Sequence, residues 1–286
     1  MEGQRKSIHL FDLDDTLIRT EARVLVRGGG GVLLRALAPS EFTVYQAAPG
    51  EVFDFREFSD LGILSRGIMV KYTKSIIDTI LKYGTHSEFG ILTARSDKKL
   101  HAPFLIRLFK SIFGVRLSNE LIFAVSDSRF SGYKDRGGLG GTAPFASLSV
   151  PQRKALVIAQ DLVGRGFNDI SFYDDSRENL ESFKVLRQAF PHVTYKPHFI
   201  DPTWTARLGE FLDSGAPSKA LIKGASSVRI ILEHHASPGT DPQSAMRQLA
   251  EGKAIRLDTV PVWMVHAEGK FHLSRSESGI AADDGS

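Results

Sequence analysis

Acidic and hydroxyl side chains directly follow short apolar runs at several points in the sequence. The segment FDLDDTL carries Asp12 and Asp14 two residues apart, and FYDDSREN carries Asp174 followed by Asp175. ILTAR ends an apolar run at Thr93. Carboxylates can attack an electrophilic centre, transfer protons, or hold a hard divalent cation such as Mg²⁺. Together these residue types favour phosphoryl-transfer chemistry.

The demands of that chemistry explain why paired aspartates are useful. Hydrolysis of a phosphate monoester requires the barrier to fall by about 20 kcal/mol. An attack by Asp12 would replace one hard displacement by two easier ones. Asp14 could then protonate the leaving alkoxide and later deprotonate the attacking water. Two neighbouring carboxylates in different surroundings can hold the different protonation states that these roles need.

The elements that must position these residues alternate along the chain. Buried strands are expected where β-branched and aromatic residues run without alternation, at residues 8–13, 89–93, 121–125 and 170–174, with a fifth at 193–200. Helical patterns lie between them, around 68–83, 98–113 and 152–165. This alternation predicts an α/β fold with a doubly wound parallel sheet and helices on both faces.

The predicted fold brings the polar strand ends together. In open α/β sheets the ligand site lies beyond the carboxyl ends of the strands. We therefore expect Asp12, Asp14, Thr93 and Asp174 to meet in one crevice. If Asp12 and Asp174 share a cation, they must lie within about 10 Å of each other.

The four motifs FDLDDTL, ILTAR, the helix that carries Lys154, and FYDDSREN resemble, in order and spacing, those of the haloacid dehalogenase superfamily. The resemblance covers roughly residues 7 to 200. It implies a Rossmannoid sheet of strand order 5-4-1-2-3, with Asp12 as nucleophile and Asp14 as general acid and base. The second aspartate of the first motif favours a phosphatase over a dehalogenase.

The resemblance also implies how the phosphoryl group and a metal would be held. Thr93 and Lys154 would contact phosphoryl oxygens, with Lys134 as the alternative lysine. Mg²⁺ would be bound by Asp12, Asp174 and the backbone carbonyl of Asp14. Asp175 would be a ligand through water or an orienting partner.

Three regions are expected along the chain: a catalytic domain at 1–215, an α+β appendage at 216–275 and a disordered tail at 276–286. An insertion at about 20–68 occupies the position of a cap, and its pattern predicts two short strands joined by a turn at Gly28 to Gly31. Such a small flap would leave an open site. The expected substrate is therefore a phosphorylated small molecule, a nucleotide or a nucleic-acid 3′ end, as in the similar phage-encoded phosphatases and polynucleotide 3′-phosphatases.

Several features admit a second interpretation. The loop at 126–149, with Arg129, Lys134 and Arg136, either faces the substrate or is mobile. Asp175 and Asn179 either serve the site or only cap the helix that follows. The rings of Phe53, Phe55 and Phe58 favour packing over base stacking, and the adjacent His234 and His235 are interpreted as structural. The whole chain could also be an interaction or virion-associated protein that uses the appendage for binding.

Composition excludes several classes of protein. The absence of cysteine excludes disulfides and thiolate chemistry. The 36 basic and 33 acidic residues leave a net charge of +3, too small to indicate nucleic-acid binding by itself. No apolar stretch approaches the roughly 20 residues of a membrane span, and the charged start MEGQRK argues against a signal peptide. We expect no membrane partner and a cytoplasmic protein, in the host cytoplasm if phage-encoded; the oligomeric state stays open.

Overall fold

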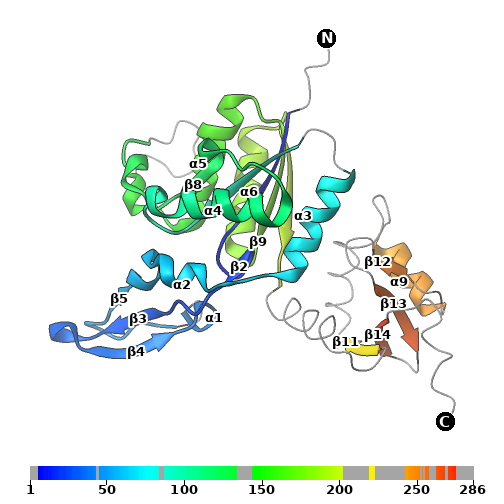
Figure 1. Cartoon of the computed structure of the whole chain (residues 1–286), viewed down its shortest axis with the longest axis horizontal. Coiled ribbons are helices and arrows are strands. Elements are labelled where there is room, and N and C mark those ends of the chain that lie inside the picture. Colours follow the sequence, from blue (N-terminus) through cyan, green and yellow to red (C-terminus); the bar gives the residue numbers. More distant parts are fainter. Residues whose placement is uncertain are drawn as a thin grey trace. The chain divides into compact units, whose positions relative to one another are not determined.

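The computed structural model groups the chain into two compact units, drawn in Figure 1. One comprises Met1–Val70 with Gly84–Ile200, and the other Lys71–Tyr83 with Asp201–Ser286. The structure describes residues 6–42, 45–83, 87–133, 144–201, 219–222, 242–251, 253, 255–257, 262–267 and 270–274. The expected domain boundary at 215 and the expected tail at 276–286 lie outside the described residues.

The first unit is an α/β fold built on a parallel sheet. Its strands are β1 (Ser7–Phe11), β7 (Glu88–Thr93), β8 (Ile122–Ala124), β9 (Asp169–Asp174) and β10 (Thr194–Phe199). They lie in the order β10-β9-β1-β7-β8, and every neighbouring pair is parallel. The strands expected from the apolar runs are confirmed. Every residue of β8 and β9 is buried, as expected for runs without polar alternation.

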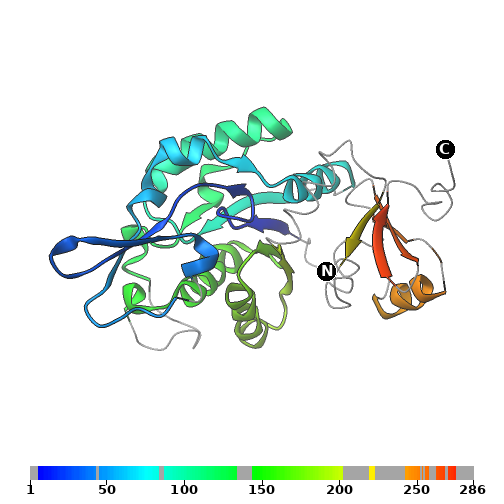
Figure 2. The same cartoon turned by 90° about the horizontal axis from the view of Figure 1, so that it is seen from below.

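Helices cover both faces of this sheet. Figure 2 shows α4 (Lys98–Phe113) on one side, and α5 (Val150–Val157) and α6 (Arg177–Ala189) on the other. Helix α5 continues through a π-helical turn, η6 (Ile158–Leu162), and a 3₁₀ turn, η7 (Val163–Arg165). The three helices begin at polar capping residues, Asp97, Ser149 and Ser176. The helical patterns at 98–113 and 152–165 are therefore confirmed.

The order of the strands identifies where a ligand would bind. The chain runs from β1 outward to β7 and β8, then returns to the other side of β1 to form β9 and β10. The direction of winding changes between β1 and β9. Such a switch point opens a crevice at the carboxyl ends of the two strands. The register pairs Phe11 with Tyr173, so the next residues, Asp12 and Asp174, stand at this crevice.

The insertion between β1 and β7 is small and rich in strands. Its two ends, β2 (Ile18–Arg19) and β6 (Ile68–Met69), pair with each other antiparallel. Between them an antiparallel sheet has the order β4-β3-β5, from β3 (Val24–Arg27), β4 (Leu33–Leu37) and β5 (Val52–Asp54). Short helices complete it: η1 (Gly29–Gly31), α1 (Pro39–Phe42), η2 (Arg56–Ser59) and α2 (Leu61–Ser65).

The turn between β3 and β4 confirms the two predicted strands. Gly30 and Gly31 have φ angles of 73° and 80°, a left-handed conformation that glycine adopts without a steric penalty. Farther along, the rings of Phe53 and Phe55 pack edge-on against Phe42, with centroids 4.9 and 5.5 Å away. The aromatic side chains of the insertion thus pack against one another.

The long loop after β8 is described in part. A 3₁₀ turn, η3 (Asn119–Leu121), precedes the strand, and η4 (Ser128–Phe130) and η5 (Phe145–Ser147) lie within the loop. Phe130 and Phe145 are buried, so both ends of the loop are packed into the unit. Lys134 and Arg136 lie outside the described residues, and the question of whether this loop faces a substrate stays open there.

The second unit contains α3 (Lys71–Tyr83) and an antiparallel sheet of order β11-β14-β13-β12. Its strands are β11 (Lys219–Ile222), β12 (Ile255–Leu257), β13 (Val262–Ala267) and β14 (Lys270–Ser274), and α9 (Pro242–Ala250) precedes β12. Strands β13 and β14 pair antiparallel, so this part of the chain contains both a helix and a β-hairpin. His234 and His235 lie outside the described residues. Among the helices that the structure describes, none combines the length and apolar content needed to cross a bilayer.

Candidate active site

A buried lysine joins the two aspartates at the switch point. The ammonium of Lys154 in α5 donates hydrogen bonds to Oδ1 of Asp12 at 2.7 Å and to Oδ2 of Asp174 at 2.6 Å. All three side chains are buried, and Lys154 is 1% exposed. Because both bonds share one nitrogen, the two carboxylate oxygens cannot be farther apart than the two bond lengths together. This separation is well inside the roughly 10 Å that a shared metal allows.

The protonation of this group reflects its burial. Burial and the negative charges of Asp174, Asp175 and Asp14 raise the pKa of Asp12 well above its usual value, and only Lys154 opposes them. Burial alone would lower the pKa of Lys154, but its two carboxylate partners raise it overall. One ammonium therefore stands among several carboxylates. The site has an excess of negative charge that an additional cation would offset.

Asp14 is held by an arginine that the sequence analysis did not single out. Arg95 donates from Nε to Oδ2 of Asp14 at 2.8 Å and from Nη2 to Oδ1 at 2.6 Å. Its third nitrogen, Nη1, donates to the backbone carbonyl of Phe58 in the insertion at 2.5 Å. Arg95 is only 3% exposed. The two-point contact fixes the orientation of the Asp14 carboxylate and ties its position to the insertion.

A tight turn after β1 allows Asp12 and Asp14 to serve the same crevice. Asp15 has a φ angle of 56°, which is uncommon for a residue with a side chain. The turn is closed by backbone bonds from Leu17 and Ile18 to the carbonyl of Leu13, at 3.0 and 2.9 Å. The strained residue lies between the aspartates and Thr16, as strained backbone at functional sites commonly does.

Thr16 and Asp175 bind each other in both directions. The hydroxyl of Thr16 donates to Oδ1 of Asp175 at 3.0 Å, and the backbone N–H of Asp175 donates to the same hydroxyl oxygen at 2.9 Å. Thr16 is fully buried. Burial and the charges of Asp174 and Asp15 raise the pKa of Asp175 to about 7. The pair fastens the loop after β1 to the loop after β9.

Asn179 contacts the site as well as the start of α6. Its side-chain nitrogen donates to Oδ1 and Oδ2 of Asp174 at 2.9 and 3.0 Å, and the backbone N–H of Ser176 also donates to Oδ1 at 2.8 Å. The capping residue of α6 is Ser176, whose hydroxyl accepts from the backbone N–H of Asn179. Asp175 and Asn179 therefore do more than cap this helix.

Thr93 ends β7 and is buried at the same edge of the sheet. Its hydroxyl oxygen accepts from the backbone N–H of Arg95 at 3.2 Å, which sets the start of the segment that carries the Arg95 side chain. The backbone carbonyl of Thr93 accepts from Val125 beyond β8. Thr93 thus links the loops that follow β7 and β8, and its O–H can donate to a ligand.

The donor set suits a hard cation. Carboxylate and carbonyl oxygens are available, whereas the imidazole and thiolate donors that favour softer metals do not line the described site. Among the residues that the structure describes, no three His, Asp or Glu side chains form a preorganised metal centre. Mg²⁺ does not need one, because it binds through one or two carboxylates together with water and substrate oxygens.

Arg95 was not among the residues predicted from the sequence, and Asn179 had two interpretations. Arg95 lies in ILTAR, two residues after Thr93. The signal that could have identified it is an arginine at the end of a buried strand, since buried arginines need an acidic partner. Asn179 carried no such signal. Lys134, the alternative to Lys154, lies outside the described residues.

Comparison of the chain with protein-family models, with curated proteins and with solved structures finds no match in any of the three.

Proposed function

We propose that this chain is a Mg²⁺-dependent phosphomonoester hydrolase of the haloacid dehalogenase type, which acts through an aspartyl-phosphate on Asp12. The observation that carries the proposal is the Lys154 ammonium between Asp12 and Asp174, at the switch point of the parallel sheet. The strand order supports it: counted along the chain, β10-β9-β1-β7-β8 is 5-4-1-2-3.

The first step is a displacement at phosphorus. A carboxylate oxygen of Asp12 forms a bond to phosphorus while the bond to the ester oxygen breaks and the electron pair leaves with the alkoxide. Lys154 reduces the negative charge of Asp12, so that an anionic phosphoryl group can approach. The hydroxyl of Thr93 and backbone amides after Asp12 donate hydrogen bonds to phosphoryl oxygens.

Mg²⁺ fits the oxygen donors of the site. Its ligands would be Asp12, Asp174 and the backbone carbonyl of Asp14, with Asp175 acting through water. When bound, it supplies the positive charge that stabilises the phosphoryl oxygens as they react. Asn179 and Thr16 hold Asp174 and Asp175 in place, as partners of metal ligands commonly do.

Asp14 transfers the protons. With both oxygens accepting from Arg95, its carboxylate is oriented to take a proton from the water that attacks the aspartyl-phosphate. In the first step Asp14 instead gives a proton to the leaving alkoxide, so its O–H must point at the ester oxygen and not at the guanidinium, which can only donate. We therefore assign the Arg95-bound arrangement to the second step, the hydrolysis of the intermediate.

The insertion favours a large or extended substrate. It consists of a three-stranded sheet and short helical segments rather than a large helical lid. An open site of this kind accommodates a nucleotide or a nucleic-acid 3′-phosphate. A small phosphorylated metabolite is the alternative that a substrate panel would reveal.

Phosphate release by the purified full chain tests the proposal. We expect hydrolysis of an aryl phosphate that requires Mg²⁺ and is abolished by Asp12→Asn. Asp78→Asn is the matched control, because Asp78 lies on α3 in an exposed ion pair with Lys74. Equal activity of Asp12→Asn and the control would contradict the mechanism. Nucleotides and 3′-phosphorylated oligonucleotides assayed alongside would identify the substrate class.

A further inference from the structure

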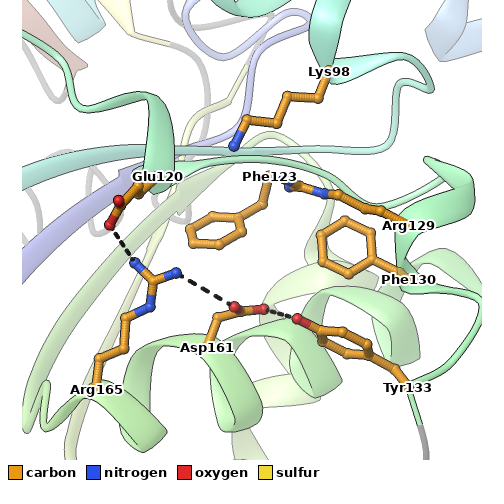
Figure 3. Close-up of a pocket in the computed structure, with 8 residues that line it drawn as sticks. All are labelled: Lys98, Glu120, Phe123, Arg129, Phe130, Tyr133, Asp161 and Arg165. Carbon is orange, nitrogen blue, oxygen red and sulfur yellow. Dashed lines mark hydrogen bonds and ion pairs between the residues drawn. The ribbon is translucent and has the colours of Figure 1, made fainter.

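A second pocket lies in the first unit, beside the edge strand β8. It has a volume of about 370 Å³, within the range of small-molecule sites. Figure 3 shows side chains that point toward a common space. They come from α4, η3, β8, η4, the loop residue Tyr133, and the turns η6 and η7 that continue α5. Its lining does not include the carboxylates or the lysine of the candidate active site.

One wall of this pocket is an internally paired network. Tyr133 donates its hydroxyl hydrogen to Asp161 at 2.6 Å, and Arg165 lies 3.7 Å from Asp161 and 3.4 Å from Glu120. The acidic side chains of the pocket are therefore already matched by Arg165 and Tyr133. The other two cationic side chains of the pocket, Lys98 and Arg129, form no ion pair with these acidic residues.

Lys98 is the first of these cations. Figure 3 shows its side chain extending toward the pocket, with no interaction drawn to the other lining residues. Among the described residues, its ammonium has no hydrogen bond or ion pair, although its backbone N–H donates to Asp127 at 3.0 Å. Burial and the charges of Arg129 and Arg165 lower the pKa of Lys98 to about 8. An anion beside the ammonium would raise this pKa again, because a negative charge stabilises the protonated form.

Arg129 is the second cation, and it is held in place. Its guanidinium lies over the ring of Phe130, 4.3 Å from the centroid, and Nη2 donates to the carbonyl of Ile122 at 3.1 Å. Its backbone N–H donates to Asp127, as does that of Lys98. A guanidinium has five N–H donors, so Arg129 retains capacity for a ligand. Asp127 thus fixes the backbone at both cationic residues.

We propose that this pocket binds a phosphate group, held between Lys98 and Arg129, on a ligand of nucleotide size. Charge-assisted hydrogen bonds from an ammonium and a guanidinium are the usual contacts of a bound phosphate. The aromatic walls formed by Phe130 and Tyr133 suit the apolar or planar remainder of such a ligand. The phosphate belongs to a free nucleotide or to one link of a nucleic-acid strand, and the ligand is bound without being changed.

Titrations followed by amide NMR test this site separately from hydrolysis. All are done with full-length Asp12→Asn, so that no phosphate ester is consumed. The probes are inorganic phosphate, a nucleoside monophosphate and an oligothymidylate with a 3′-hydroxyl end. The amides of Arg129 and Tyr133 report on the pocket, and those of Thr16 and Asp175 report on the candidate active site. Lys98→Gln and Arg129→Gln remove the proposed contacts, and Lys99→Gln, at an exposed neighbouring position, is the matched control.

We expect at least one probe to shift the pocket amides to saturation. Lys98→Gln and Arg129→Gln should each weaken that binding by about tenfold to a hundredfold, and Lys99→Gln should not. Preference for the nucleoside monophosphate would identify a free nucleotide, and preference for the oligothymidylate a strand; both support the site. Unshifted pocket amides, or equal affinity in Lys98→Gln and Lys99→Gln, would overturn it. Neither result depends on whether Asp12 is a nucleophile.

Discussion

Arg95 binds both carboxylate oxygens of Asp14, with Nε 2.8 Å from one and Nη2 2.6 Å from the other. The same side chain reaches the carbonyl of Phe58, so one arginine connects the proposed base to the insertion. This relationship makes the position of the proposed base depend on a contact outside the sheet. It also separates the two proposed steps, because both oxygens of Asp14 act as acceptors while Arg95 holds it.

Replacement of Arg95 should slow the second step most. In Arg95→Met, Asp14 loses its orientation, and hydrolysis of the aspartyl-phosphate should slow by about 100-fold, within the usual range for a general base. Rapid-mixing kinetics with an aryl phosphate should then show a burst of phenol release followed by slow turnover. Arg187→Met, which removes a contact to the backbone of Tyr195 instead, should show no burst. If the initial phenol release and the steady turnover both fall by the same factor in Arg95→Met, the variant has only lost folded protein, and this role is refuted.

Removal of the buried ammonium should destabilise the fold. Lys154→Met leaves Asp12 and Asp174 buried without their shared partner, and loss of one member of a buried ion pair costs about 3–5 kcal/mol. Urea unfolding in the presence of a chelator measures the change. Lys184→Met, at an exposed helical position, should change the free energy of unfolding by less than about 0.5 kcal/mol. Equal stability of the two variants would contradict the ion-pair arrangement.

The bond between Thr16 and Asp175 should contribute measurably to stability. Thr16→Val keeps the shape of the side chain but leaves the backbone N–H of Asp175 without its acceptor, at a cost of about 1–3 kcal/mol. Thr16→Ser keeps the hydroxyl and should lose less. Thermal unfolding of both variants makes the comparison. If the Thr16→Val and Thr16→Ser proteins unfold at the same temperature, the hydroxyl is not what joins the two loops.

Mg²⁺ should stabilise the folded chain if it binds as proposed. At a concentration of 100 times its dissociation constant, a ligand specific for the folded state adds about 2.7 kcal/mol. Asp174→Asn should greatly reduce this increment, and Asp78→Asn should leave it intact. Thermal unfolding at a series of Mg²⁺ concentrations measures this increment, with protein in excess chelator as the metal-free reference. A similar increment in Asp174→Asn would exclude that carboxylate as a ligand.

The first unit could be predicted well because its signals are local. Unbroken apolar runs determine buried strands, and a parallel sheet brings their carboxyl ends to one edge. These two signals are enough to predict that Asp12 and Asp174 lie together. Lys154 comes from a helix 142 residues away from Asp12 in the sequence, and only the resemblance indicated it.

The contact between Arg95 and the insertion, and the pocket beside β8, could not be predicted in this way. The contact between Arg95 and Phe58 depends on how the insertion folds back, which no periodicity specifies. Lys98, Arg129 and Arg165 come from three separate elements, and their convergence depends on helix packing. The sequence showed the arginine-containing loop but not the space that Arg129 enters.

The most direct test of the central claim is to identify the phosphorylated residue. A radiolabelled phosphate ester would be mixed with the full chain and Mg²⁺, quenched in acid within milliseconds, and digested for peptide mapping. We predict an acid-stable, base-labile label on the peptide that contains Asp12, with a larger amount in Arg95→Met and none in Asp12→Asn. Rapid hydrolysis with no label on any peptide, or a label on a different residue, would contradict the account.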